Sequence, residues 1–93
     1  MPYSKEYRPA LVALGKRFIA ARAIAKRSQA DVAHALRMSQ ASLSHIERGA
    51  ETSLSTFVDI AREFDLEPML VPKPLVRIVN DLIASNSRIR GNK

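Results

Sequence analysis

Two short stretches of helical sequence, each opened by a serine cap and separated by a tight turn, constrain this chain most. Ser28 stands three residues before Asp31, so its hydroxyl can accept the Asp31 amide while the carboxylate lies at the positive end of a helix. Ser39 repeats the cap, and Gly49 suits the stop of a helix only two turns long. The pattern predicts a helix, a turn and a second helix over residues 28–49.

The rest of the chain predicts further helices around this pair. Pro9 suits a first helical position, and apolar residues spaced three and four apart predict a helix over about 9–26. Ser53 can cap another helix, which Pro68 prevents from continuing. An amphipathic pattern predicts a last helix over 74–84. We therefore expect an all-α bundle of four to five helices with one short C-terminal strand.

The expected strand is the short apolar stretch before the last helix. Met69, Leu70 and Val71 lie between Pro68 and Pro72, which predicts a strand tolerated only at a sheet edge. Such a strand needs a partner. The polar, basic end of the chain predicts disorder. The expected organisation is an N-terminal segment 1–8, a helix-turn-helix domain 9–66, a strand 67–72, a helix 73–84 and a disordered tail 85–93.

Length and composition exclude several classes of function. A chain of 93 residues makes one thin-cored domain, which favours oligomerisation and leaves no room for a separate catalytic module. It has no cysteine for a disulfide or thiolate metal site, and two histidines, His34 and His45, are too few for a dedicated metal centre. It also lacks a G-x-x-x-x-G-K-[ST] phosphate loop. We expect no enzyme activity, cofactor, metal or small-molecule substrate.

The net charge points to a polyanion as the partner. The chain carries 15 Lys and Arg against 9 Asp and Glu, a net charge of +6. Residues 1–49 hold a net +6, residues 50–72 a net −4 and residues 73–93 a net +4, so the basic face belongs to the N-terminal half. No apolar run approaches the roughly 20 residues that span a bilayer, and the start does not resemble a secretory signal. We expect a cytoplasmic, nucleoid-associated protein.

The second helix of the capped pair has the composition of a helix that reads DNA. In a helix-turn-helix, the first helix crosses the DNA backbone and the second lies in the major groove. The apolar residues of the second helix must face its neighbours, which leaves mostly small or hydrogen-bonding residues outside. Gln40 can bond bidentately to adenine, and Ala41 can touch a thymine methyl group. The side chains expected at base edges are Gln40, Ala41, Ser44 and His45.

Two runs of residues, 28–33 (SQADVA) and 39–49 (SQASLSHIERG), resemble the Cro and lambda-repressor type of helix-turn-helix protein, the XRE family. The resemblance covers residues 14–66. It implies that Gln40, Ala41 and His45 read bases, although Ser44 or Arg48 could dominate over His45. It also implies a structural ion pair between Arg22 and Glu47, which keeps an acid on this helix from repelling phosphate. The expected phosphate contacts are Ser28, Gln29, Arg37, Ser42 and Arg48.

One residue departs from the family pattern. Arg37 stands where the family usually has glycine in a left-handed conformation, and a residue with a Cβ costs roughly 1 kcal/mol there. We therefore expect a slightly remodelled turn. Arg37 could instead add a phosphate contact or remain a solvated arginine.

Residues 54–58 (LSTFV) and 64–73 (FDLEPMLVPK), preceded by Tyr7-Arg8-Pro9, resemble the HipB antitoxins. The resemblance implies that the strand, with Met69, Leu70 and Val71, pairs with its copy in a homodimer. It further implies that the dimer represses its own operon by binding inverted-repeat operator DNA, and that it binds a HipA-type kinase toxin. The alternative is a stand-alone helix-turn-helix regulator, linked to a phage or an operon, without a toxin partner.

Two segments keep more than one interpretation. The acidic stretch 50–72 can serve as a surface for a basic protein partner or as a plain solvated face. The apolar stripe of the helix over 74–84 can pack in the core or in a dimer, or it can face a toxin or a membrane. Its basic residue Arg77 argues against membrane attachment.

Overall fold

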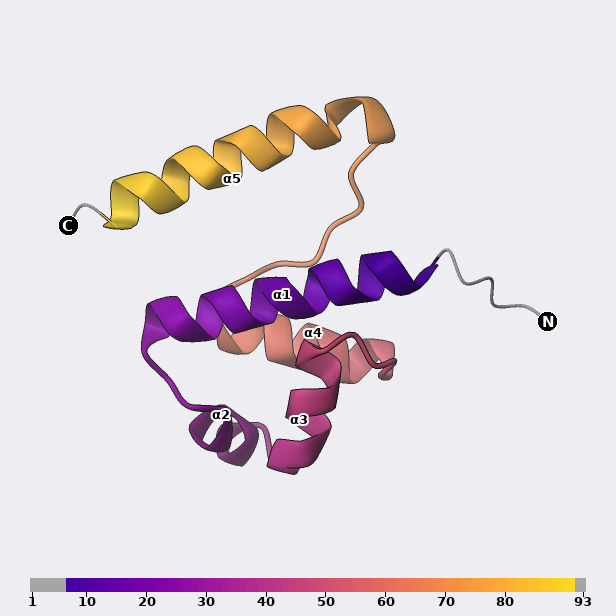
Figure 1. The fold of residues 1–93 in the computed structure, drawn as a ribbon, viewed down its shortest axis with the longest axis vertical. Coiled ribbons are helices and arrows are strands. Elements are labelled where there is room, and N and C mark those ends of the chain that lie inside the picture. The colour runs from indigo at the N-terminus through magenta and orange to yellow at the C-terminus, as the bar shows by residue number, and fades with distance from the viewer. Residues whose placement is uncertain (1–6, 92–93) are drawn as a thin grey trace.

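Four helices of the chain pack around one apolar core, and a fifth helix lies beside them. The computed structural model describes residues 7–91, with side chains for residues 7–86. In Figure 1, α1 crosses the middle of the molecule, α2 and α3 lie on one side of it, and α5 lies on the other. The elements are α1 (Arg8–Ala25), α2 (Gln29–Ala35), α3 (Gln40–Glu47), α4 (Leu54–Glu63), the 3-10 turn η2 (Lys73–Leu75) and α5 (Val76–Gly91).

The core is small and draws on each of the first four helices. The rings of Phe18 in α1 and Phe57 in α4 lie with their centroids 5.3 Å apart and join these two helices. Leu14 and Leu54, which share the helical periodicity, are exposed because so small a domain cannot cover the whole of each stripe. The buried apolar residues are Phe18, Val32, Ala33, Leu43, Ile46, Ile60 and Ala61. The described residues form helices and no strand, so the expected helical bundle is confirmed.

Serine caps open α2, α3 and α4, as the sequence predicts. The hydroxyl oxygens of Ser28, Ser39 and Ser53 each accept the amide of the residue three positions later, at 3.0 to 3.1 Å. Each bond pairs a donor that the first turn of a helix leaves without an intrahelical partner. The bounds of the two helices in the helix-turn-helix are therefore set locally by the sequence.

The first four helices end in the same backbone pattern, a left-handed residue just past the last turn. After α3, Gly49 has a φ of 101°, and the amides of Gly49 and Ala50 donate to the carbonyls of Ile46 and His45. The equivalent residues after α1, α2 and α4 are Lys26, Arg37 and Asp65, with φ values of 56°, 56° and 60°. Three of the four ends thus hold a side chain in a conformation that favours glycine.

The turn between α2 and α3 is not remodelled around Arg37, so that expectation was wrong. The Arg37 amide donates to the carbonyl of His34 at 3.1 Å, and the Met38 amide donates to that of Ala33 at 2.9 Å. These two bonds pair the last carbonyls of α2 and hold Arg37 left-handed. Arg37 stays left-handed despite the strain on a residue with a Cβ, because both hydrogen bonds form only in this conformation.

The C-terminal third differs from the sequence expectation in two places. Residues 66–72 form no strand, because a ladder needs a second strand and neither Pro68 nor Pro72 can donate to one. The tail expected to be disordered is helical over residues 85–91, since no glycine or proline interrupts α5 before Gly91. The rest of that tail, residues 92–93, and residues 1–6 of the N-terminal segment lie outside the described residues.

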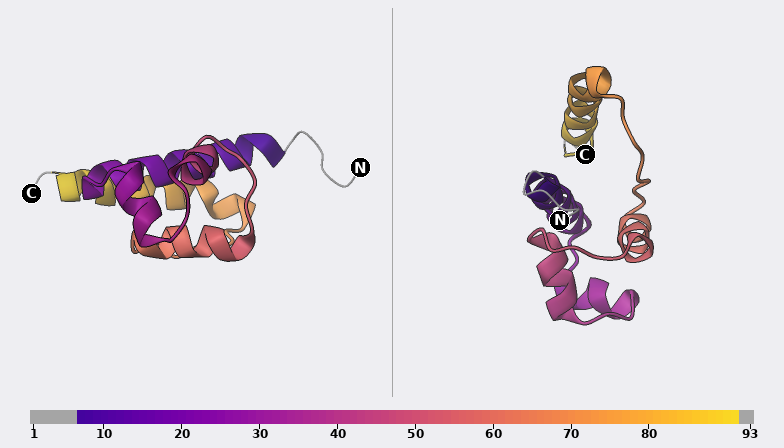
Figure 2. Two further views of the ribbon diagram at one scale, coloured as in Figure 1. Left: turned by 90° about the horizontal axis from the view of Figure 1, so that it is seen from below. Right: turned by 90° about the vertical axis from the view of Figure 1, so that its right-hand side faces the viewer.

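α5 lies on the side of α1 that faces away from the helix-turn-helix. The right-hand view of Figure 2 shows α1 between α5 and the pair formed by α2 and α3, with residues 66–72 leading from α4 to α5. None of the residues that form the apolar core belongs to α5. The first four helices therefore bury their own core without α5.

The left-handed turn yields a stability prediction. We expect Arg37→Gly to stabilise the folded protein by about 0.5 to 1 kcal/mol, because glycine adopts this φ without a Cβ clash. Arg37→Ala is the matched control, since it removes the same charge and keeps the Cβ. Urea unfolding monitored by circular dichroism measures both. An equal gain from Arg37→Ala would show that charge, not backbone strain, is responsible.

Candidate nucleic-acid interface

α3 presents a buried face to the bundle and an open face to solvent. Leu43, Ile46 and Glu47 are buried. Of the four residues expected at base edges, Gln40, Ala41 and His45 are exposed and Ser44 is half-buried. The open face is therefore composed mainly of small and hydrogen-bonding side chains, with the exposed Arg48 at the C-terminal end of the helix. Such a surface can approach the edges of base pairs without a buried charge.

An ion pair fixes α3 to α1. Arg22 Nε lies 2.9 Å from Glu47 Oε2 and Arg22 Nη2 lies 3.1 Å from Glu47 Oε1, so the contact is bidentate. Arg22 Nη1 also donates to the carbonyl of Arg27, 3.2 Å away. Glu47 is 2% exposed, and no other charged side chain among the described residues is buried. Its carboxylate is therefore turned inward and is not part of the open face.

The same carboxylate orients an amide on α2. Gln29 Nε2 donates to Glu47 Oε1 at 2.8 Å, and Gln29 Oε1 accepts from Gln40 Nε2 at 3.4 Å. Because a carboxylate only accepts hydrogen bonds, Glu47 determines which end of the Gln29 amide faces it. The bonds run from Arg22 through Glu47 and Gln29 to Gln40, at the start of the helix that faces outward.

Opposing effects act on the pKa of Glu47. Burial by itself raises the pKa of this carboxyl, but the hydrogen bonds from Arg22 and Gln29 and the charge of Arg22 outweigh burial, and the pKa lies below its ordinary value. The hydrogen bond with Glu47 is in turn the main cause that raises the pKa of Arg22. Glu47 therefore stays ionised in the folded protein at neutral pH.

A close backbone contact that the sequence analysis missed positions α3 against α1. Gly15 is buried in the middle of α1, and a Cβ built on it would lie 2.8 Å from the carbonyl oxygen of Ile46 and closer still to that of Glu47. Contacts this short force the backbone to move, so only glycine fits. A glycine inside a predicted helix was the available signal, because glycine there is unfavourable unless packing requires it.

The residues expected to contact phosphate lie around α3. Ser28 caps α2 and Gln29 is its first residue, while Arg37 lies in the turn before α3 and Arg48 just after it. Ser28, Arg37 and Arg48 are exposed. The Ser42 hydroxyl is also exposed and accepts from Ser39 Oγ at 2.8 Å. Hydroxyl, amide and guanidinium donors thus flank the open face, as phosphate binding requires.

Other basic and acidic residues pair with each other. Arg27 Nη1 lies 2.8 Å from Glu63 Oε2, and Arg62 Nη2 lies 3.4 Å from Glu67 Oε2 at the surface. The Tyr7 hydroxyl donates to Glu51 Oε2 at 2.7 Å. Several acids of the stretch 50–72 are therefore already engaged within the chain, which reduces the negative surface that this stretch offers to a partner.

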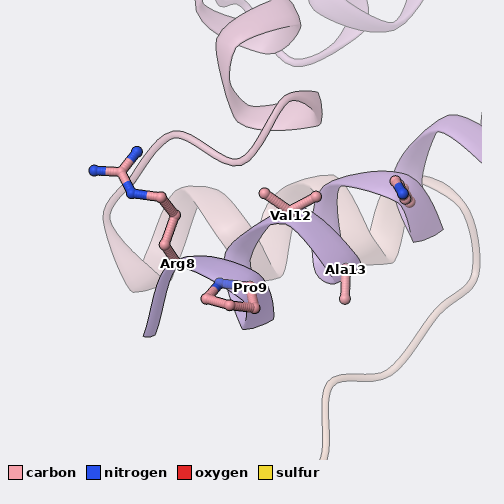
Figure 3. A pocket seen from close by; sticks show the side chains of 5 residues that line it. Arg8, Pro9, Val12 and Ala13 are labelled. Atoms are coloured by element: carbon pink, nitrogen blue, oxygen red, sulfur yellow. The ribbon is translucent and has the colours of Figure 1, made fainter. Parts of the chain in front are cut away.

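The described surface carries hollows beside α1 and beside α3. Figure 3 shows one of them, and every residue that lines it belongs to α1, so it has no opposing wall to enclose a ligand. A second hollow lies beside α3 and includes His45 and Glu51. The first is lined by Arg8, Pro9, Val12, Ala13 and Lys16.

The described residues include neither a metal cluster nor a membrane-spanning helix. No group of three or more His, Asp or Glu is arranged there to hold a metal ion. None of the helices in this part of the chain is long and apolar enough to cross a membrane.

The buried carboxylate yields a prediction about stability and pH. We expect Glu47→Gln to destabilise the protein by about 3 kcal/mol at pH 7, because it leaves the Arg22 charge without its partner. Since the folded-state pKa of Glu47 lies below its ordinary 4.5, this stabilisation is present above about pH 4.5 and is lost as the pH falls through the lower value. The difference between wild type and variant should therefore narrow in acid.

Glu67→Gln is the control for this measurement, because it removes an exposed pair whose loss costs below about 0.5 kcal/mol. Urea unfolding at pH 7 and pH 4 compares the proteins. The assigned role of Glu47 would be contradicted if both variants lowered the free energy of unfolding equally, or if the decrease caused by Glu47→Gln did not change with pH.

Comparison with known proteins agrees with this geometry. Residues 19–70, a little more than half of the chain, match the Helix-turn-helix protein family. The chain is 39% identical over 69 residues to an uncharacterized HTH-type transcriptional regulator, y4dL, of Sinorhizobium fredii (strain NBRC 101917 / NGR234). The match covers 73% of this chain and 35% of that relative, so the chain spans about a third of its length. No solved structure matches the chain. The chain therefore belongs to the XRE-type helix-turn-helix family.

Proposed function

We propose that this protein is a sequence-specific transcriptional repressor that binds inverted-repeat operator DNA as a homodimer. The observation that carries the proposal is the open face of α3, where Gln40 lies exposed at the N-terminal end and its amide contacts Gln29. Residues near the start of a recognition helix are those that contact base edges. A second protomer places another α3 about 34 Å away, in the next major groove.

Base reading in this proposal depends on the amide of Gln40. One of its two N–H groups donates to Gln29, which leaves the other N–H and the carbonyl oxygen for adenine N7 and N6. Ala41 and His45 then contact neighbouring bases, with Ser44 or Arg48 as alternatives to His45. Gln29 contributes a second N–H for phosphate, because Glu47 uses only one. Ser28, Arg37, Ser42 and Arg48 supply the remaining phosphate contacts.

The dimer in this proposal includes a β-ribbon between two copies of residues 69–71. Met69 and Leu70 are exposed and Val71 is half-buried in the single chain, so the backbone at this point is accessible to a second copy. A ribbon would also supply the ladder partner that a strand between two prolines lacks within one chain.

Binding to DNA selected from a random library tests the repressor function. We expect Gln40→Ala to weaken binding to the selected site by about 5- to 150-fold and to change binding to random DNA little. Gln29→Ala should weaken both, because its main target is phosphate. The double variant should cost less than the product of the two single effects, since Gln29 contacts Gln40.

Fluorescence anisotropy at several salt concentrations provides the measurement. If each protomer neutralises three to five phosphates, log K should fall with log salt with a slope on the order of −5 to −9. Equal affinity for selected and random DNA, or affinity independent of salt, would refute the proposal.

A second candidate is a role as a HipB-like antitoxin, which would add a HipA-type kinase toxin as a partner. The observation that favours it is the likeness of residues 54–73 to HipB antitoxins. Asp59 and Asp65 are exposed on this stretch and would face a basic partner, although Glu63 and Glu67 already pair with arginines. Without a toxin, the same DNA-binding machinery would act as a stand-alone regulator.

Co-expression with the neighbouring gene distinguishes these two roles. If the neighbour encodes a kinase-like protein, we expect a tagged copy of this chain to retain it through purification and to relieve its toxicity. Asp59→Lys should weaken that capture because it reverses an exposed charge, whereas Gln40→Ala should leave it unchanged. A neighbour of another kind, or a kinase that does not bind, would favour the stand-alone regulator.

A further inference from the structure

The connection between α1 and α2 carries an ion pair of its own. Arg27 directly precedes Ser28, the cap of α2, and its Nη1 lies 2.8 Å from Oε2 of Glu63, the last residue of α4. In Figure 1 this connection and the C-terminal end of α4 lie on the same side of the molecule. The pair therefore joins α4 to the segment that leads into the helix-turn-helix.

The backbone of Arg27 is held in place independently of this ion pair. Its amide donates to the carbonyl of Arg22 at 3.1 Å, and its carbonyl accepts from Arg22 Nη1 at 3.2 Å. Arg22 is itself anchored by its bidentate contact with Glu47. The main chain of Arg27 therefore has a set position beside Ser28, and its side chain can exchange one partner for another without moving α2.

The pair between Arg27 and Glu63 is looser than the pair between Arg22 and Glu47. Arg27 donates to Glu63 from Nη1, whereas Arg22 binds Glu47 through two nitrogens. The side chains of Arg27 and Glu63 are 31% and 28% exposed, against 2% for Glu47. An ion pair that water reaches contributes little to stability, and a guanidinium has five N–H donors. Arg27 can therefore turn to another anion at little cost.

The position of Glu63 is not explained by α4 itself. Glu63 lies at the C-terminal end of this helix, where the unpaired carbonyls carry partial negative charge and disfavour a carboxylate. Arg62, the residue before it, has the charge that suits a helix end of this polarity. The contact that favours an acid at position 63 is the one with Arg27.

We propose that Glu63 competes with a DNA phosphate for the guanidinium of Arg27 and thereby limits the affinity of the protein for DNA. The inference rests on the proposed function. Arg27 lies one residue before Ser28 and two before Gln29, which are both expected to contact phosphate, so its side chain begins beside the DNA backbone. A phosphate offers oxygens that match the fork of a guanidinium. In the complex, Arg27 leaves Glu63 and binds phosphate.

The competition affects all DNA sequences alike. Phosphate contacts fix the register of a protein on DNA and carry no sequence information. Glu63 therefore lowers affinity for the selected site and for random DNA by the same factor, and the ratio of the two affinities does not depend on it. This distinguishes Glu63 from Gln40, whose substitution is expected to change that ratio.

Fluorescence anisotropy with the selected site and with random DNA tests the inference. We expect Glu63→Gln to bind both DNAs about 5-fold or more tightly than wild type, because Arg27 no longer has to leave a carboxylate. The slope of log K against log salt should become steeper by about 1 for each protomer. Glu67→Gln is the matched control, because it removes the same charge from an exposed pair with Arg62, and it should change affinity less than about 2-fold.

Substitution of Arg27 shows whether the gain depends on that side chain. Adding Arg27→Gln to Glu63→Gln should abolish the gain in affinity and return the salt slope to the wild-type value. Circular dichroism should report the same helical content for each variant, since neither residue belongs to the apolar core. The inference is overturned if Glu63→Gln binds no more tightly than Glu67→Gln, or if the gain persists without Arg27.

A charge-swapped variant separates this role from a structural one. Arg27→Glu combined with Glu63→Arg keeps the net charge and can restore the pair in reverse, so a pair that serves only to hold α4 predicts unchanged DNA binding. The inference predicts weaker binding to both DNAs, by at least about 5-fold, because the swap places a carboxylate beside Ser28 and the phosphates. Unchanged binding by a folded swap variant would contradict the inference.

The same measurements keep the inference and the repressor proposal apart. A wild type that discriminates between DNA sequences, together with a Glu63→Gln variant that gains nothing, supports the repressor and overturns the role of Glu63. A wild type that binds all DNA equally refutes the repressor, and a gain in Glu63→Gln that requires Arg27 still supports the competition. A wild type that binds no DNA overturns both.

Discussion

The buried carboxylate of Glu47 is the interaction on which the rest of the interface depends. It accepts two bonds from Arg22 and one from Gln29, so a single group on α3 joins α1 and α2. A buried charge is strongly destabilising without such partners, and the arrangement therefore tolerates few alternatives. The carboxylate also affects the exposed face of α3. It sets the orientation of the Gln29 amide, which in turn accepts a hydrogen bond from the exposed Gln40 amide.

Local chemistry made most of the helical bundle predictable. The serine caps and Gly49 define the ends of α2 and α3 through bonds within a few residues, and these bonds occur as expected. The pairing of Arg22 with Glu47 came from family resemblance, since two residues 25 positions apart carry no local signal of contact. Gly15 was visible only as an unfavourable residue in a helix, because its reason lies in the backbone of α3.

The errors of prediction have equally physical causes. The turn at Arg37 was expected to change shape, but two backbone bonds outweigh the roughly 1 kcal/mol of strain. The tail was assigned to disorder from its polarity although nothing in residues 85–90 stops a helix. The strand over 67–72 needs a second chain to form a ladder, so it stays a prediction. The predicted base and phosphate contacts depend on DNA, so neither the sequence nor a single protein chain decides them.

The contact of Gly15 with α3 has a consequence for how this protein can change. At Gly15, α1 packs directly against the main-chain carbonyls of Ile46 and Glu47, so the side chains on the outer surface of α3 take no part in this contact. Ala41 and His45 can thus be exchanged for other residues without shifting the helix that bears them. If the open face of α3 reads DNA as we propose, its position is set separately from the identity of its exposed side chains, and substitutions at solvent-exposed sites suffice to change the preferred operator.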